Sequence, residues 1–414
     1  MSDKRPIRAT SGTNQEGTSA HNRRVMIDAL RLNGQLSRAD LARATNLSKQ
    51  AVSNIIEELQ RDGLVVSLEV VRKGRGQPST PYQLVAGGAF AIGLQIDRHV
   101  TRAAGVDLLG CVLARAEANL PQGGPAQGGP AQGVQVILDL IENVRAQLMQ
   151  RDAASEKRLV GLGVAMPGPF GLESTEDDPW MMAAWQNFPL LETLAAGTGL
   201  QVGLQNDAAA SATAERMVGA AHGLDNAVCL FLGYGIGAGI IVNGELYSGA
   251  NGNAGELGMV LTPPAPNGDR LQPLEHRAAL ASLYQHMGLD PADPDLQQKL
   301  AAVATADDAQ RLDAWISHAA VDLRWSIQLI ETIFDPQTVI LCGSAPEPLA
   351  RRLMDAIHPL LPSIADRPTR TLPRLQLGMT DPWAVALGAA AEPISRAFDP
   401  RFSAILKTRL NGVS

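Results

Sequence analysis

The sequence contains few cysteines and lacks long apolar runs. Its 414 residues include three cysteines, Cys111, Cys229 and Cys342. Their wide spacing argues against a disulfide framework and against a zinc cluster held by thiolates. We therefore expect the three cysteines to be small apolar residues of the core. No window holds 18 uncharged apolar residues, which predicts that the chain has no membrane-spanning helix. The polar first 20 residues lack the apolar segment of a secretory signal, and these absences together predict a cytoplasmic protein.

Charge is present in both signs but is unevenly distributed. The first 86 residues hold 13 Lys and Arg against 8 Asp and Glu, a balance of +5. The whole chain holds 35 Lys and Arg and 42 Asp and Glu, so the remaining 328 residues hold 22 basic and 34 acidic residues, a balance of −12. A basic head on an acidic body favours a polyanionic partner for the head alone. Ordinary variation in surface charge is the alternative, so the residue pattern has to decide.

The basic head has the pattern of three helices. They are predicted over 21–33, from Ser37 to 45, and from Ser48 to the stop at Gly63, with the two serines as N-caps. The third helix carries one apolar stripe. Its opposite face begins with short polar groups and one cation, which suit base edges in a major groove. These candidate DNA-reading residues are Ser48, Lys49, Gln50, Ser53 and Asn54.

A basic, glycine-rich loop follows between two predicted strands, at 64–70 and 82–84. Its tip carries Arg72, Lys73 and Arg75, which such a wing can place in a narrow minor groove. We therefore predict a disordered tail over 1–20 and a winged helix–turn–helix domain over 21–86, with a double-stranded DNA operator as partner. A dimerisation or protein-docking bundle is the alternative, because short three-helix patterns are not specific.

The acidic body alternates strands and helices. Strands are predicted at 89–97, 100–109, 111–118, 158–168, 200–207, within 226–249 and at 338–343. Helices are predicted at 134–150, 191–199, 208–221, 276–287, 313–333, 346–358 and 382–396. A QGGPA repeat within 119–135 predicts a flexible surface loop. The alternation predicts an α/β fold of two lobes with a crevice between them.

Three motifs carry a family resemblance. They are GLGVAMPGPF (161–170), LQNDAAASATAER (204–216) and FLGYGIGAGIIVNGELYSGANGNAGELGM (231–259). With the winged head, their order and spacing resemble the ROK family of repressors and sugar kinases, from about residue 20 to 395. Winged members include bacterial N-acetylglucosamine and xylose repressors.

The resemblance implies an actin- or hexokinase-like body. Its first lobe would span 87–205 and be joined by the C-terminal helix near 382–396, and its second lobe would span 206–381. It also implies a homodimer or a homotetramer.

The chain departs from the kinase members of the family at both phosphate loops. Asp97 is kept, but Arg98 and His99 replace glycines that allow close approach to phosphate, and Tyr234 replaces a threonine. Phosphoryl transfer depends on positioning phosphates and metal. We therefore expect no enzyme activity and no catalytic residue.

The chain also departs from the zinc-binding members. Met259 stands where the family has a histidine, and the cysteine run that follows in the family is missing. A tetrahedral zinc site needs such ligands. We therefore expect no metal and no cofactor.

The residues that the family uses to bind sugar hydroxyls are largely kept. The resemblance assigns this role to Asn206, Asp207 and Glu256, to Glu275 by a looser alignment, and to Trp185 as a cover for a sugar face. Ionised carboxylates make strong hydrogen bonds to hydroxyl groups. The alternatives are a helix cap for Asp207, an ion pair for Glu256 and a core position for Trp185.

These observations predict a DNA-binding transcriptional regulator, a repressor of carbohydrate-use genes, whose body binds a monosaccharide or a derivative. One alternative is an active sugar kinase that carries a DNA-binding head. Another is a regulator that binds no sugar and is controlled by a partner protein.

Overall fold

The computed structural model divides the chain into two compact units, with the boundary between Gly88 and Ala89. The residues it describes are 15–70, 79–98, 100–119, 130–171, 185, 188–262, 271–291, 293, 295–305 and 310–398. Within these ranges, no helix combines the length and the apolar character that crossing a membrane requires. Each unit is described separately below.

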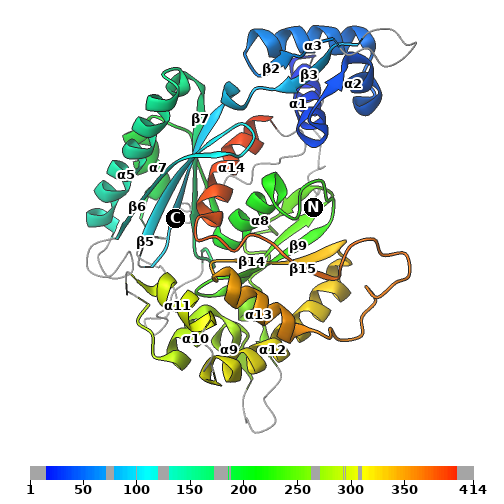
Figure 1. Cartoon of the computed structure of the whole chain (residues 1–414). Coiled ribbons are helices and arrows are strands. Elements are labelled where there is room, and N and C mark those ends of the chain that lie inside the picture. Colours follow the sequence, from blue (N-terminus) through cyan, green and yellow to red (C-terminus); the bar gives the residue numbers. More distant parts are fainter. Residues whose placement is uncertain are drawn as a thin grey trace, which may run out of the picture. The chain divides into compact units, whose positions relative to one another are not determined.

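The first unit is a three-helix domain with a small antiparallel sheet (Figure 1). Its helices are α1 (Gln15–Asn33), α2 (Arg38–Thr45) and α3 (Lys49–Arg61). Its strands, in the order β1-β3-β2, are β1 (Leu36–Ser37), β2 (Val65–Ser67) and β3 (Pro81–Leu84). The first helix begins six residues before its predicted start at 21, within the predicted tail. The two-residue β1 was not predicted.

Serine caps fix the starts of α2 and α3, as predicted. The Ser37 side chain accepts a hydrogen bond from the Asp40 backbone N–H, and the Asp40 side chain accepts one from the Ser37 backbone, which forms a capping box. Ser48 Oγ accepts from the Ala51 N–H at 3.2 Å. The predicted apolar stripe of α3 is buried at Val52, Ile55, Ile56 and Leu59.

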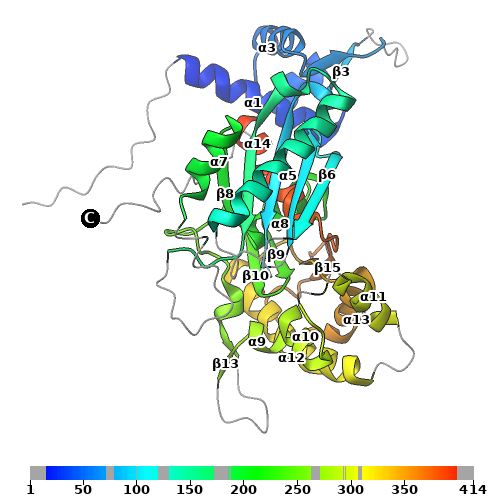
Figure 2. The same ribbon diagram turned by 90° about the vertical axis from the view of Figure 1, so that its left-hand side faces the viewer.

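The second unit contains two five-stranded sheets, each the centre of one lobe. The sheet of the first lobe has the order β6-β5-β4-β7-β8, in which β4, β7 and β8 are parallel. One face is covered by α5 (Pro130–Arg151) and α7 (Leu190–Thr198), and the other by α14 (Ala384–Phe398), as Figure 2 and Figure 1 show. The strands are β4 (Phe90–Ile96), β5 (Val100–Asp107), β6 (Val112–Asn119), β7 (Leu159–Met166) and β8 (Val202–Asn206).

Three glycines in register let α14 lie directly against this sheet. Gly93 of β4 pairs with Gly163 of β7, which pairs with Gly203 of β8. A Cβ atom at Gly93 or Gly163 would overlap the α14 backbone, and one at Gly203 would lie 2.7 Å from the Glu392 carboxylate. Hydrogen in place of a side chain is therefore required along this row.

The sheet of the second lobe has the order β11-β10-β9-β14-β15. Helix α8 (Asp207–Val218) packs on one face, while α10, α12 and α13 and the sheet form the largest apolar core on the other. The strands are β9 (Ala227–Leu232), β10 (Ile236–Val242), β11 (Glu245–Tyr247), β14 (Thr338–Gly343) and β15 (Leu375–Leu377). The helices are α9 (Glu275–Ala278), α10 (Leu280–Met287), α11 (Leu296–Thr305), α12 (Gln310–Phe334) and α13 (Glu347–Ile357).

The two lobes meet where α8 crosses α14. A Cβ atom at Gly388 of α14 would overlap the Ala210 backbone of α8. Alanines dominate both helices here, and Val385 and Ala389 of α14 belong to the same apolar cluster as Ala208 and Ala210. We call this contact the α8–α14 seam.

The predicted α/β fold of two lobes is confirmed, with three local differences. Helix α5 begins at Pro130, inside the repeat that was expected to form a loop, because proline is well tolerated in a first helical turn. Strands β12 (Leu261–Thr262), β13 (Gln272–Pro273) and β15 and helix α11 were not predicted. Cys229 and Cys342 are buried as expected, but Cys111 is exposed, because it directly precedes β6 at the turn.

Candidate functional site

A cavity of about 550 Å³ lies between the two lobes. Because β4, β7 and β8 are parallel, their carboxyl ends meet at one sheet edge, and Asp97, Gly168 and Asn206 follow or end them there. The second lobe supplies Glu256 and Glu275. Asp207 begins α8 and also lines the cavity. Four of the five residues predicted to bind sugar therefore line one cavity.

Asn206 connects the two lobes across this cavity. Its Oδ1 accepts a hydrogen bond from the Ala209 N–H at 2.8 Å, so Asn206 and not Asp207 is the N-cap of α8. Its Nδ2 donates to Glu256 Oε1 at 3.2 Å. The cap fixes the orientation of the amide, and the amide in turn fixes one oxygen of Glu256.

Asp207 carries a carboxyl oxygen that has no hydrogen-bond partner among the described residues. This atom, Oδ1, is inaccessible to solvent. Burial is the main cause that raises the pKa of Asp207 well above its ordinary value, Asp97 and Glu256 raise it further, and Arg98 opposes them. A buried acceptor without a donor costs free energy, which a ligand hydroxyl group would recover.

Glycines make room for the two glutamates. A Cβ atom at Gly168 would overlap the Glu256 carboxylate, and one at Gly235 or Gly258 would lie 2.8 Å from Glu275 Oε2. Gly168 was not predicted as a site residue. Its position directly after a buried strand, in a Met-Pro-Gly sequence, was the available signal.

Arg98 and Tyr234 line the same cavity, and Tyr234 belongs to the glycine-rich turn between β9 and β10. The Arg98 guanidinium carbon lies 4.7 Å from the centre of the Tyr234 ring, and Arg98 is 8% exposed. One guanidinium nitrogen of Arg98 lies 3.8 Å from Asp97 Oδ1. Burial raises the pKa of Tyr234, so its ring remains a neutral cation–π partner. His99 lies outside the described residues.

A second connection between the lobes was not predicted. Asn253 Oδ1 accepts from the Phe170 N–H at 3.0 Å, and Asn253 Nδ2 donates to the Phe170 carbonyl at 2.9 Å. This pair ties the loop that precedes Glu256 to the loop after β7. No sequence signal distinguished Asn253 from the other polar residues around it.

Trp185 is not where the resemblance placed it. It is 1% exposed, packs in the core of the first lobe and makes an edge contact with Phe188 at a ring separation of 6.2 Å. It does not line the cavity. The position of its ring agrees with the alternative given for Trp185, a core residue beside the sheet.

Met259 ends a short 3-10 helix, η4 (Leu257–Met259), and is 48% exposed. Within the described ranges, no three His, Cys, Asp or Glu side chains are grouped as a metal ion would require.

The candidate DNA-reading residues lie at the start of α3. Ser48, Lys49, Gln50 and Asn54 are exposed, and Ser53 is half-buried. Gln50 Nε2 donates to Asn54 Oδ1 at 2.9 Å, one turn apart. The predicted wing residues Arg72, Lys73 and Arg75 lie outside the described residues.

Comparison with known proteins agrees with both units. The ROK family profile matches residues 109–391, and a MarR family profile matches residues 26–76. The chain is 28% identical to a xylose repressor of Caldicellulosiruptor bescii over 249 residues, which span 57% of each chain. It is 24% identical to the DNA-binding transcriptional dual regulator NagC of Escherichia coli over 76% of this chain and 78% of that one.

The fold has a match among solved structures. The crystal structure of a ROK family transcriptional regulator, a homologue of the Escherichia coli MLC protein, superimposes with a TM-score of 0.63 and 22% identity. The match covers 92% of this chain and 97% of that one.

Proposed function

The chain belongs to the ROK family, and we propose on this premise that it is a transcriptional regulator that represses carbohydrate-use genes. The first unit binds an operator as a winged helix–turn–helix domain, and the second binds a monosaccharide or a derivative as effector. The similarity to a xylose repressor and to NagC supports this class of function.

The observation that carries the proposal is the buried Asp207 carboxyl group. Asp207 lines the cavity together with Glu256, its buried Oδ1 has no hydrogen bond from the described residues, and Glu256 Oε1 accepts a hydrogen bond from the Asn206 amide. A carbohydrate offers several hydroxyl donors in a small volume. Charged acceptors make hydrogen bonds to such donors about twice as strong as neutral acceptors do.

We propose that this cavity does not support phosphoryl transfer. A kinase needs space for phosphate and metal next to the sugar hydroxyl. Here Arg98 lies across the Tyr234 ring, at the turn where the family's phosphate loop would be. These two side chains fill volume that a nucleotide phosphate would need.

The effector site is tested by measuring the Tm of the full chain in the presence of each member of a panel of sugars. We expect one sugar or sugar derivative to raise Tm, and Glu256→Gln to remove the shift. The control is Glu192→Gln on α7, which changes an exposed carboxylate outside the cavity. A response to no sugar across a broad panel would reject the effector site and favour control by a partner protein.

An assay with ATP, Mg²⁺ and the same panel tests the alternative of an active kinase. We expect no sugar-dependent ADP. Sugar-dependent ADP that disappears in Asp207→Asn would overturn the assignment as a regulator without enzyme activity.

Operator selection from random DNA, followed by affinity measurements, tests the first unit. Lys49→Ala and Gln50→Ala remove a candidate cation and a candidate base contact. We expect each to weaken specific binding by about 1–3 kcal/mol and Gln50→Ala also to relax the selected sequence. Gln60→Ala, exposed at the opposite end of α3, is the control and should bind like the wild type.

Salt dependence tests the wing separately. Arg75→Ala should reduce the dependence of operator affinity on salt concentration, because one phosphate contact fewer releases fewer counterions. Unchanged affinity and an unchanged salt slope would count against the wing assignment.

A further inference from the structure

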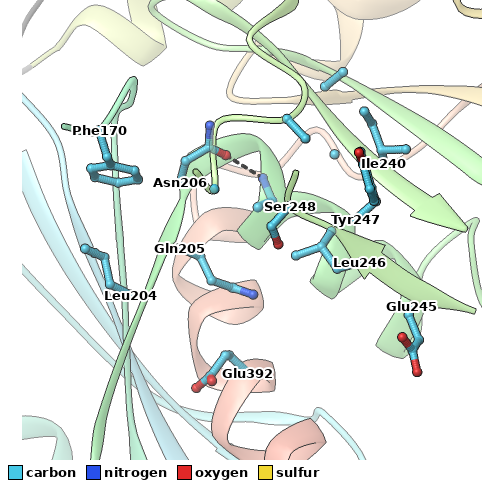
Figure 3. A pocket seen from close by; sticks show the side chains of 15 residues that line it. Phe170, Leu204, Gln205, Asn206, Ile240, Glu245, Leu246, Tyr247, Ser248 and Glu392 are labelled. Carbon is cyan, nitrogen blue, oxygen red and sulfur yellow. Dashed lines mark hydrogen bonds between the residues drawn. The ribbon is translucent and has the colours of Figure 1, made fainter. Parts of the chain in front are cut away.

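A second cavity, of about 750 Å³, lies on the other side of Asn206. Among the described lining residues, it shares only Asn206 with the first cavity. Figure 3 shows it between β8 and α14 on one side and the β10–β11 hairpin on the other. A molecule in this cavity would therefore contact both lobes.

The wall of this cavity combines apolar and aromatic side chains. Phe170 and Leu204 come from the first lobe, and Ile240, Leu246 and Tyr247 from the second (Figure 3). Tyr247 is 53% exposed. Concave apolar walls with a few placed polar groups are typical of sites for small organic molecules.

The charged residues that line the cavity are both acidic. They are Glu392 of α14 and Glu245 of β11, and no Lys, Arg or His is among the described lining residues. Glu392 is 5% exposed, and its Oε2 receives no hydrogen bond from the described residues. Arg396 lies 3.3 Å from this oxygen, one helical turn away, without hydrogen-bond geometry and outside the lining.

Gln205 adds a second acceptor whose orientation is fixed. Thr213 Oγ1 donates its only proton to the Ala209 carbonyl at 2.8 Å, so it can only accept from Gln205 Nε2, at 3.3 Å. The other end of the amide, Gln205 Oε1, is inaccessible to solvent and has no hydrogen bond within the described chain. Two buried acceptors thus lack donors beside the same cavity.

We propose that this second cavity binds a small organic ammonium compound with an apolar or aromatic body. The acidic lining at Glu392 and Glu245 attracts the charge of the ammonium group. The aromatic rings of Phe170 and Tyr247 suit the remainder of the ligand and its cation. A neutral alcohol of the same shape offers one hydrogen-bond donor instead of three and gains no charge attraction.

Binding of benzylamine and of benzyl alcohol to the full chain tests this proposal. We expect benzylamine to raise Tm and to bind, by calorimetry, at least tenfold more tightly than benzyl alcohol, which corresponds to about 1.4 kcal/mol. Glu392→Gln should weaken benzylamine binding by at least tenfold, whereas Glu192→Gln should leave it unchanged.

A second variant keeps the test decisive if Glu392→Gln folds poorly. Leu246→Trp fills the cavity from the β10–β11 hairpin and should abolish benzylamine binding while leaving the sugar response intact, because Leu246 does not line the first cavity. Equal binding of amine and alcohol, no binding of either, or benzylamine binding that survives Leu246→Trp would each overturn the proposal. A chain that responds to no sugar can still bind benzylamine, so the proposal for this cavity and the proposal for the effector site can be rejected independently of each other.

Discussion

Asp207 is expected to reduce stability in the absence of ligand. Burial and the charges of Asp97 and Glu256 disfavour its ionised form, which raises its pKa. Asp207→Asn keeps the shape and removes the charge. We expect the ligand-free variant to have a higher Tm and a free energy of unfolding that is larger by about 1 kcal/mol. We also expect it to lose its response to sugar. Melting curves with and without sugar at neutral pH measure both effects, and a less stable, sugar-responsive variant would contradict the assignment.

Glu392 should make stability depend on pH. Burial raises the pKa of Glu392 to about 7, against the opposing effect of Arg396. In the unfolded chain its pKa is about 4.3, so the stabilisation is fully present below that pH and is lost as pH rises through about 7. The glutamine in Glu392→Gln stays neutral at every pH. We therefore expect the Tm of the variant, relative to the Tm of the wild type, to increase from pH 5 to pH 8. A constant Tm difference over this range would reject the effect.

At the scale of single residues, sequence predicts chemistry better than contacts. Asn206, Asp207 and Glu256 could be predicted to lie together because their motif is specific, and the structure places all three around one cavity. The N-cap role fell on Asn206 and not on its neighbour, since both residue types cap helices equally well. Glu392 had no signal, because its burial depends on Gly203, which lies far away in the sequence and next to it in the fold.

The contact between α14 and the first sheet depends on the row of Gly93, Gly163 and Gly203. A methyl group at Gly163 would overlap the backbone of Ala389, which cannot move as a side chain can. We expect Gly163→Ala to destabilise the second unit by about 3 kcal/mol, measured by denaturant unfolding. The control is Gly197→Ala on α7, whose new methyl group would meet only the flexible end of Leu138. Here we expect a change within about 1 kcal/mol, and equal losses in the two variants would refute the role of the row.

Elements with strong periodicity were predictable, and short ones were not. The capped helices α2 and α3 follow directly from Ser37 and Ser48. Strand β1 has two residues and β15 has three, which is too few for any alternation to be recognised. The polar start of α1 and the Pro130 start of α5 lack the apolar spacing that marks a packed helix, so their first turns were assigned to a tail and a loop.

Across the whole molecule, the sugar and the operator should influence each other. We expect the effector sugar to weaken operator affinity by about 5- to 150-fold, the usual range for coupled sites. Asp207→Asn should bind the operator but ignore the sugar. Titration of labelled operator at several sugar concentrations measures the coupling, and equal operator affinity with and without a sugar that binds would contradict it.

The overall architecture was predictable because motif order is a property of the whole chain. Three motifs and a basic head were sufficient to indicate two lobes and a winged domain, and the family match supports that fold. The second cavity was not predictable in this way. Its walls come from β8, α14 and the β10–β11 hairpin, which no single stretch of sequence contains.

The α8–α14 seam has a consequence for how the lobes can move. Gly388 and Ala210 bring two helix backbones together with little more than methyl groups around them. At the crossing itself the two helices therefore meet through backbone and methyl groups, while farther along Arg216 of α8 donates a hydrogen bond to Ser395 Oγ of α14 at 3.3 Å, which sliding would have to break. Small sliding of packed helices is a recognised form of domain motion. Here the shape of the two contacting helix backbones would determine the direction of the sliding. A larger side chain on either helix at the crossing would prevent this sliding and hold the lobes in one arrangement, while the residues that line the two cavities stay unchanged.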